Sequence, residues 1–341
     1  MGDRAWGTVR EDYSANGDAW SFLTHDMARS KAYRWGEDAI AGVCDRYQLL
    51  VCAPAFWNGC DPILKERYFG LTAREGNRGE DVKEYYFYLD NTPTHSYMRM
   101  LYKYPQAPYP YQRLLDENRA RQGGGMEFEL LDTGVFDENR YFDIAIEHAK
   151  ASPEDICIRI EAFNRGPAAA ELHVIPQLWF RNTWAWGVAR DGQPRIQLGT
   201  RPSESLAFIA LEATDNETEQ LRNLTVDYQL GTRWLYGPAD GEPMFTNNET
   251  NGPAVWGPAA ASASPFTKDA FHRHIVRGEA ATNPVPEGTK GGLHYRAMVP
   301  AGGSIVWRFR LAPIVLGTPL HDVDAIVAMR KREADEFYAA I

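Results

Sequence analysis

An aromatic ring followed closely by two carboxylates occurs early in the chain, as Trp35, Glu37 and Asp38. Such a ring can stack on the apolar C–H face of a pyranose, while the carboxylates accept hydrogen bonds from the sugar hydroxyls. The same residues could instead form a buried loop whose carboxylates are hydrogen-bonded within the protein. The residue types therefore allow a sugar-binding site here without requiring one.

A second aromatic group lies at 179–186, where Trp179, Trp184 and Trp186 accompany Asn182. Each aromatic ring can offer about 150–250 Å² of contact surface. These tryptophans could stack on a sugar or pack in an interface between domains, where aromatic residues are enriched. Both interpretations predict a flat apolar surface beyond the end of a strand.

Acidic residues also cluster at 75–84, including Glu80 and Asp81. They could place carboxylates in a cleft, but Arg78 and Lys83 are near enough in sequence to pair with them, and a solvated loop is the interpretation we favour. No spacing typical of a metal site, a phosphate loop or a nucleophile elbow is present. The sequence thus predicts no metal and no cofactor.

The composition limits the classes of partner. The chain has 341 residues with 46 acidic and 36 basic side chains, which give a formal net charge of −10. An acidic chain without a basic run is a poor candidate for nucleic acid or an anionic membrane. Charges interrupt every apolar stretch, so neither a signal peptide nor a membrane span is predicted. The four cysteines lack zinc-type spacing, which predicts reduced thiols in a cytoplasmic protein.

Alternating apolar residues predict the central strands. Residues 156–163 and 171–180 alternate on either side of the turn-forming sequence at 164–167, so we expect a hairpin with Ile158 and Val174 on its buried face. A second hairpin is predicted at 293–299 and 304–312, with Arg308 and Arg310 facing outward. Such spacing is typical of an antiparallel sandwich.

Further elements follow from the same patterns. A short helix is predicted at 114–122, and 231–264 is rich in Gly, Pro and Asn and reads as a loop region. The other predicted strands are at 49–57, 84–90, 96–104, 127–131, 141–148, 205–212 and 224–230.

The end of the chain has helical periodicity instead. Val323, Val327, Phe337 and Ile341 share one side of a helix for which Asp322 is a plausible N-cap. An apolar stripe of this kind must be covered, either by the sandwich or by another domain.

Several long runs resemble one known family. They are 6–14, 28–38, 57–67, 79–90, 92–98 and 178–184. These runs are similar to the amino-terminal region of bacterial and fungal glycoside hydrolase family 63 proteins, which are relatives of mannosyl-oligosaccharide glucosidase. The family pattern has His where Arg78 stands, and 231–264 matches poorly. Arg67, within the third run, joins the candidate substrate-binding residues.

The resemblance implies a β-supersandwich of the galactose-mutarotase type at 1–315 and a linker helix at 316–341. It also implies an (α/α)₆ catalytic barrel that lies outside this chain. Family members invert the anomeric configuration, which requires two carboxyl groups roughly 6.5–9.5 Å apart with a water between them. Because these carboxylates belong to the barrel, no catalytic residue is predicted here, and we expect no hydrolysis of α-glucosides by the isolated chain.

Three functional hypotheses fit these features of the sequence. The first is a non-catalytic sandwich that supports the barrel, in cis or in trans, and lines part of a cleft for an α-glucoside or oligosaccharide. The second is a free-standing carbohydrate-binding module. The third is a mutarotase-like epimerase, which needs a general acid and a general base; His148 and His173, both on predicted strands, are the residues that leave it open.

Overall fold

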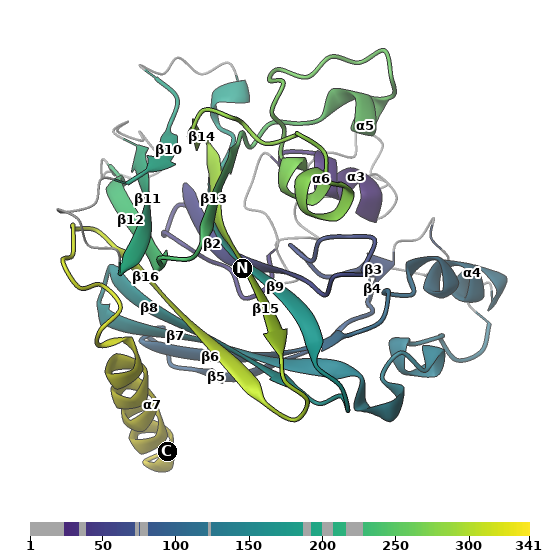
Figure 1. Ribbon diagram of the computed structural model, residues 1–341, viewed down its shortest axis with the longest axis horizontal. Helices are drawn as coiled ribbons and strands as arrows, with labels where there is room; N and C mark the ends of the chain where they lie inside the picture. The colour runs from purple at the N-terminus through teal and green to yellow at the C-terminus, as the bar shows by residue number, and fades with distance from the viewer. Residues whose placement is uncertain are drawn as a thin grey trace.

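The fold is an antiparallel β-sandwich with short helices at one end and a long helix on an outer face (Figure 1). The computed structural model describes residues 24–33, 39–71, 75, 81–121, 124–186, 192–199, 207–215 and 228–341. Two large sheets pack face to face within these residues, and the expected mainly antiparallel β architecture is confirmed. None of the helices in these ranges combines the length and hydropathy needed to cross a membrane.

The smaller of the two sheets has five strands. In spatial order they are β1 (Val43–Cys44), β2 (Leu50–Trp57), β9 (Ala170–Phe180), β15 (Lys290–Val299) and β13 (Glu242–Thr246).

The larger sheet has nine strands. In spatial order they are β14 (Glu287–Gly288), β10 (Arg195–Leu198), β11 (Phe208–Asp215), β12 (Gly231–Pro238), β16 (Ser304–Ala312), β8 (Asp155–Asn164), β7 (Tyr141–Ser152), β6 (Tyr97–Pro105) and β5 (Tyr85–Asn91). A short pair, β3 (Gly70–Leu71) and β4 (Asp81–Val82), forms a separate ladder.

Alternation along the strands fills the space between the sheets with apolar side chains. Phe56, Leu178 and Leu293 come from the five-stranded sheet, and Ile144 and Phe309 come from the nine-stranded sheet. All five are fully buried. Each such side chain contributes about 1.5–3 kcal/mol on burial, so this layer is the main source of stability.

The predicted hairpin pairing of 156–163 with 171–180 is wrong. β8 and β9 belong to different sheets, so Ile158 pairs with Phe309 and His148, whereas Val174 pairs with Tyr295 and Phe56. The prediction that Ile158 and Val174 are buried is confirmed. A hairpin and an arch between sheets have the same alternation and the same turn residues, so the pattern identifies the buried face but not the ladder partner.

The predicted hairpin at 293–312 is wrong for the same reason, because β15 and β16 also lie in different sheets. Asn164 joins the two arches at the edge of the sandwich. Its side-chain amide donates to the carbonyls of Ala168 and Val299, at 2.8 and 2.9 Å. Its backbone carbonyl accepts from the N–H of Gly302, which has the positive φ that glycine tolerates. The two crossings are therefore stacked and support each other.

Two other segments differ from expectation. The predicted loop at 231–264 contains strands β12 and β13, which cross between the sheets at 239–241. Residues 127–131 do not form the predicted strand. The end of this segment belongs to a 3-10 helix, η2 (Leu130–Thr133). Glu129 and Asp132 form a capping box there, and that local hydrogen bonding favours a helical turn over a strand.

Other predicted elements are found. Strands β2, β5, β6, β7 and β11 occupy the expected regions, and the expected short helix is α4 (Tyr111–Arg121). Of the strand predicted at 224–230, residues 224–227 lie outside the described residues.

The terminal helix is α7 (Val323–Ala339), and it packs on the outer face of the nine-stranded sheet (Figure 1). Val323, Val327 and Ala334 are buried against Tyr97 and Cys157. Asp322 does not cap the helix through its side chain; it accepts a hydrogen bond from Arg310 instead.

Helix α7 also explains why Arg310 is not an outward-facing surface residue. The guanidinium donates to both carboxylate oxygens of Asp155, at 2.7 and 2.8 Å, and to Asp322 at 2.8 Å. Only 7% of Arg310 is exposed, because the start of the helix covers this side of the sheet.

Candidate functional site

Next to the apolar side chains of Ala55 and Ile175, the outer face of the five-stranded sheet carries polar side chains. Strand β9 turns Leu172, Val174 and Leu178 toward the core. Gln177 and Trp179 occupy the alternate positions of the strand and therefore face outward, yet they are only 1% and 5% exposed. These polar groups are therefore covered by other parts of the chain and not by solvent.

Neighbouring strands leave room above Gln177. In the ladders, Gln177 stands between Ala53 on β2 and Gly292 on β15. Both neighbours are small, and a Cβ at Gly292 would come within 3.0 Å of the ring of Phe271 on α6 (Ala270–Arg277). The small residues thus let α6 approach the sheet while the amide of Gln177 remains uncovered by its strand neighbours.

A loop at 58–67 carries two further residues to this face. Asn58 holds the start of this loop. Its side-chain oxygen Oδ1 accepts hydrogen bonds from the backbone N–H groups of Cys60 and Asp61, at 3.1 and 2.7 Å. The loop returns to the sheet where Lys65 and Phe56 exchange backbone hydrogen bonds. Glu66 and Arg67 follow directly and lie beside Gln177 and Trp179.

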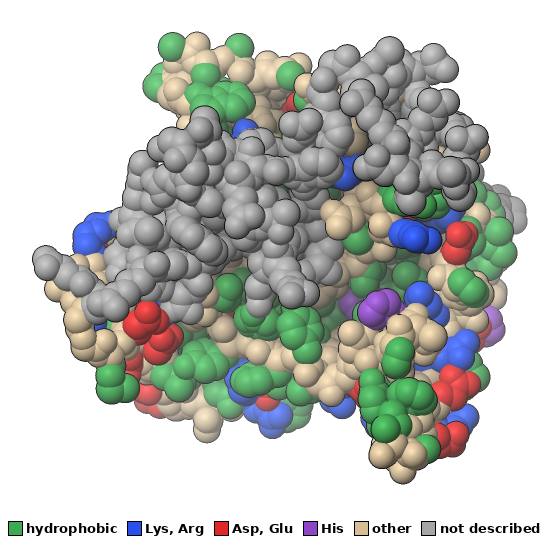
Figure 2. All heavy atoms as spheres, turned by 180° about the vertical axis from the view of Figure 1, so that it is seen from behind, with side chains coloured by type: hydrophobic (Ala, Val, Ile, Leu, Met, Phe, Trp, Pro, Cys, Tyr) green, Lys and Arg blue, Asp and Glu red, His purple; other side chains and the backbone are tan. Residues whose placement is uncertain are grey.

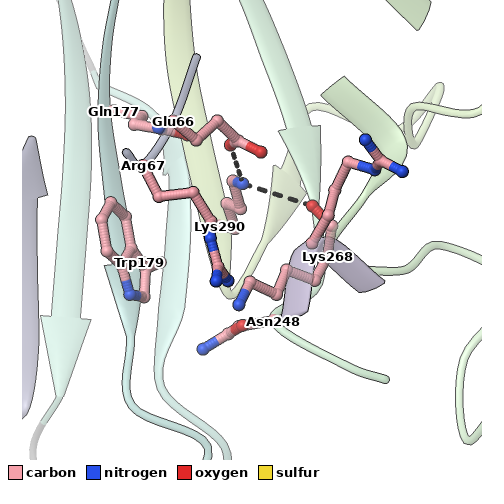
Figure 3. Close-up of a pocket in the computed structure, with 8 residues that line it drawn as sticks. Glu66, Arg67, Gln177, Trp179, Asn248, Lys268 and Lys290 are labelled. Carbon is pink, nitrogen blue, oxygen red and sulfur yellow. Dashed lines mark hydrogen bonds and ion pairs between the residues drawn. The ribbon is translucent and has the colours of Figure 1, made fainter. Parts of the chain in front are cut away.

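Two lysines complete the wall. Lys290 is the ladder partner of Trp179, and its ammonium lies 2.5 Å from Glu66 and 3.2 Å from the backbone carbonyl of Lys268 (Figure 3). The ammonium of Lys268 donates to the carbonyls of Ala28 and Lys31, at 3.2 and 2.9 Å. Ala28 lies in helix α3 (His25–Ser30) and Lys31 is its C-cap, so Lys268 fixes the end of α3 over the sheet.

Together these residues line a small pocket, named here the Gln177 pocket (Figure 3). Its described lining is Arg29, Glu66, Arg67, Gln177, Trp179, Asn248, Lys268 and Lys290. About 20 Å³ of it is open to water-sized groups, which is room for a single small group rather than a sugar ring. Figure 3 shows the guanidinium of Arg67 and the ammonium of Lys268 extending into the same space.

A larger pocket adjoins it, named here the Trp256 cleft, with a volume of about 490 Å³. Its described lining is Lys31, Ala32, Tyr33, Asn182, Ala185, Glu249, Thr250, Trp256, Ala261 and Ala263. Tyr33 links it to the first pocket, because its hydroxyl accepts a hydrogen bond of 2.7 Å from Arg67. This volume is typical of small-molecule sites.

Glu249 fixes one wall of the Trp256 cleft. Its carboxylate accepts from the indole N–H of Trp184 at 2.6 Å and from the amide of Asn182 at 3.1 Å. The same amide donates to the carbonyl of Asn248 at 2.8 Å. At the mouth, Trp256 is 60% exposed, and Lys31 lies 5.1 Å from its ring centroid. The cleft therefore combines fixed polar groups with an accessible aromatic ring.

Burial and charge shift several pKa values around these pockets. Burial opposes ionisation of Glu66, but the ammonium of Lys290 outweighs it, so the pKa of Glu66 is lowered and the carboxylate is ionised at neutral pH. Burial, assisted by the positive charge of Lys268, lowers the pKa of Lys31. Burial also lowers the pKa of His272 to about 4, so this imidazole is neutral at pH 7.

A buried ionic network lies on the other side of the 58–67 loop. The ammonium of Lys65 is 2.7 Å from Glu84, and both side chains are 1% exposed. Glu84 also accepts from the hydroxyl of Tyr102 at 2.6 Å, and Lys65 lies 3.5 Å from the centroid of the Tyr109 ring. This network is enclosed by the protein and positions the loop that carries Glu66 and Arg67.

A histidine pair occupies the opposite end of β9. Nδ1 of His173 lies 2.7 Å from Nε2 of His294, and Nε2 of His173 lies 3.0 Å from Glu171. Burial lowers the pKa of His173, and it lowers that of His294 to about 3. Neither histidine lines the Gln177 pocket or the Trp256 cleft. His148 is buried in the core, where its pKa is lowered to about 4.

Some of the predicted site residues lie together in the structure, and others do not. It brings together Arg67, Trp179, Asn182 and Trp184 at one end of the five-stranded sheet. Trp186 ends the short helix η4 (Trp184–Trp186) beside them. Asp81 begins β4 and pairs with Leu71. Trp35, Glu37, Asp38 and Glu80 lie outside the described residues.

Several residues of the two pockets were missed. Gln177 could have been found, because alternation places it on the same face as Trp179. Glu249, Trp256 and Lys268 lie in or beyond the predicted loop region 231–264, and their approach to the sheet depends on crossings that alternation does not reveal. Among the described residues, no group of three or more His, Cys, Asp or Glu is placed to hold a metal ion.

Comparison with known proteins gives one extensive sequence relative. The chain is 37% identical over 380 aligned positions to the uncharacterized protein YMR196W of Saccharomyces cerevisiae, an alignment that covers 99% of this chain and 34% of that protein. The chain thus spans about a third of the length of the curated relative it matches. No family model matches the chain.

Among solved structures, a "putative aldose 1-epimerase" of Escherichia coli K12 is 9% identical, with a TM-score of 0.27. The match covers 76% of this chain and 82% of that one. A TM-score this low does not establish a shared fold.

Proposed function

We propose that this chain is a non-catalytic, carbohydrate-binding β-sandwich of a family 63-like α-glucosidase, in which it supports a separate catalytic barrel and lines part of the sugar cleft. The observation that carries this proposal is the wall of the Trp256 cleft. There, one carboxylate holds both Asn182 and Trp184, two residues within the run 178–184 that resembles the family. A pyranose can stack its apolar face on an accessible aromatic ring while its hydroxyls form hydrogen bonds with fixed polar groups beside that ring.

The carboxylates in the cleft support binding rather than hydrolysis. Among the described residues that line it, Glu249 is the one carboxylate, and it already accepts hydrogen bonds from Asn182 and Trp184. An inverting glycosidase requires two carboxyl groups roughly 6.5–9.5 Å apart, one of them free to act as a base on water. The proposal therefore assigns hydrolysis to the separate barrel.

The end of α7 supports the proposed role as a domain partner. Phe337, Tyr338 and Ile341 are 45%, 46% and 86% exposed. Hydrophobic side chains gather on the protruding end of this helix (Figure 2). In the proposal, this end docks on the helical barrel, either in the same polypeptide or in another one.

Binding is tested by isothermal titration of the purified chain with maltose and longer α-linked glucose oligomers. The wild type is expected to bind weakly, and Trp256→Ala and Glu249→Gln should each lower the affinity at least tenfold. Trp307→Phe, a conservative change on β16 in the core, is the matched control and should leave binding unchanged. Undetectable binding by the wild type, or equal binding by Trp256→Ala, would contradict the proposal.

The epimerase hypothesis has one specific observation in its favour, the set formed by Glu171, His173 and His294. It pairs a carboxylate with an imidazole, as a mutarotase requires. In this structure the two groups contact each other directly instead of flanking a space for the anomeric carbon. Polarimetry of freshly dissolved α-glucose decides the matter: acceleration that is lost in Glu171→Gln would favour epimerase activity over the proposal above.

A further inference from the structure

We propose that the Gln177 pocket is a binding site for a small oxyanion, namely phosphate or the phosphate or carboxylate group of a larger ligand. This site is distinct from the Trp256 cleft and does not depend on sugar binding there. The inference rests on polar atoms of Gln177 and Trp179 that the described residues leave without partners, and on the charges that surround them.

Gln177 provides the first observation. Both its amide nitrogen and its amide oxygen are buried and make no hydrogen bond with any described residue. Burying an amide in this way costs about 1–3 kcal/mol unless something completes its hydrogen bonds. A glutamine with 1% exposure on the outer face of β9 is therefore better explained by a ligand than by packing.

Trp179 provides a second donor, because its indole N–H is also buried and without a partner among the described residues. It stands two residues after Gln177 on the same face of the strand, so both side chains line the same space. Figure 3 shows Gln177 beside Glu66, and Trp179 to the left of the space into which Arg67 and Lys268 extend. Two neutral donors and the cationic side chains thus line one small pocket.

The charges favour an anion over water or a neutral hydroxyl. The described lining contains four cationic side chains, from Arg29, Arg67, Lys268 and Lys290, and one carboxylate, Glu66. That carboxylate is already paired with Lys290 at 2.5 Å, and Arg29 is paired with Asp26, outside the described lining, at 3.0 Å. Water could satisfy an amide and an indole in a polar pocket of this size. Cations gathered there would be stabilised further by a negative ligand, through charge-assisted hydrogen bonds.

The size of the pocket limits how the anion enters. With about 20 Å³ open to water-sized groups, the pocket admits only oxygens at the end of a ligand. A free phosphate and the charged group of a phosphorylated or carboxylated sugar both present such oxygens. In the second case, the rest of the ligand would extend away from the sheet.

The experiment is isothermal titration of the full chain with sodium phosphate, with ionic strength held constant by sodium chloride, followed by thermal unfolding with and without phosphate. Phosphate should bind and raise the Tm of the wild type, because a ligand that binds only the folded state stabilises it. Gln177→Leu and Trp179→Phe should each weaken phosphate binding at least tenfold. Trp307→Phe, remote from the pocket, should respond as the wild type does.

Gln177→Leu also separates a ligand site from a structural role. Leucine removes two buried atoms without partners and has a similar volume, so this variant should fold and, without phosphate, should have a Tm at least equal to that of the wild type. An equal rise in Tm on adding phosphate to Gln177→Leu would overturn the inference. Binding of phosphate no stronger than of chloride, together with no binding of the charged sugars below, would also overturn it.

Two further titrations identify the source of the anion. Glucose 6-phosphate or glucuronate that binds at least tenfold more tightly than phosphate would support the site as a receptor for the charged group of a sugar. Equal affinity for phosphate and glucose 6-phosphate would support a site for the free anion. Maltose binding by Gln177→Leu should equal that of the wild type, so failure of this inference and failure of the carbohydrate proposal give different results.

Discussion

Trp184 shows how a hydrogen-bond partner changes the role of a residue. Its indole was a candidate sugar platform, but its N–H is held by Glu249 and its ring is packed against the main core. Trp184 therefore shapes the wall of the Trp256 cleft, while Trp256 offers the accessible ring. The residue type was informative in the sequence, and the exact role depended on a partner 65 positions away.

Buried histidines predict an unusual sensitivity to mild acid. Burial lowers the pKa of His148 and of His272 to about 4, whereas histidine in an unfolded chain titrates near 6.5. The unfolded state thus binds more protons between these values, so the stabilisation is complete above about pH 6.5 and is lost as the pH falls toward 4. Each histidine should account for about 3 kcal/mol of that loss.

The measurement is urea unfolding at pH 7 and pH 4.5. His148→Leu should lose less unfolding free energy between the two pH values than the wild type does. His321→Leu is the control, because the His321 side chain is 65% exposed. If His148→Leu and the wild type lose the same free energy, the imidazole of His148 does not contribute to acid sensitivity.

The loop 58–67 depends on the buried pair of Lys65 and Glu84. Glu84→Gln would leave the ammonium of Lys65 buried without its counter-charge, a change that typically costs about 3–5 kcal/mol. Adding Lys65→Met to Glu84→Gln removes the stranded charge and should recover part of the loss. Denaturant unfolding of the two variants tests this, and a cost below about 1 kcal/mol for Glu84→Gln alone would show that the pair is not required.

Helix α7 should control access to Cys157. This thiol is fully buried beside Val327, and burial raises its pKa to about 12, so it should not react with thiol reagents at neutral pH. Val327→Asp places a charge in that contact and should release the helix. A colorimetric thiol titration of the native protein should then detect Cys157 in addition to the exposed Cys44 and Cys60.

Arg332→Asp is the matched control, because residue 332 is on the exposed side of the same helix. It should give the wild-type titration. A Val327→Asp variant with unchanged thiol reactivity and unchanged stability would show that α7 is not held to the sheet by this contact.

Local sequence patterns predict the class of fold and the buried faces of this molecule, but they do not predict how the strands are connected. Ile158 and Val174 were correctly assigned to the core, yet their strands lie in opposite sheets. The side-chain period of a strand is the same in a hairpin and in an arch, and only contacts distant in sequence distinguish the two. Asn164 makes such contacts, with Val299 and Gly302.

The same limit applied to the candidate site. Arg67, Trp179, Asn182 and Trp184 were recognised because their residue types and local runs are distinctive. Lys290 was not, because it reaches the site only through the β9–β15 register, where it pairs with Trp179. Residues that act through register or through a crossing loop have no local signature, whereas residues within one aromatic run do.

The exposed end of α7 leads to a prediction for the whole molecule in solution. Phe337, Tyr338 and Ile341 present adjacent apolar surface beyond the part of the helix that Val323 and Val327 anchor to the sheet. A monomer rarely leaves such a patch uncovered, so the purified chain should self-associate through it in a concentration-dependent way. Sedimentation velocity of the wild type beside Phe337→Ser/Ile341→Ser measures this, with the change expected to shift the population to monomer. Arg332→Ser, elsewhere on the same helix, should sediment as the wild type does. A wild type that remains monomeric at high concentration, with no response to the double substitution, would show that this end of the helix is not an interaction surface, and the proposed docking on a barrel would lose its structural support.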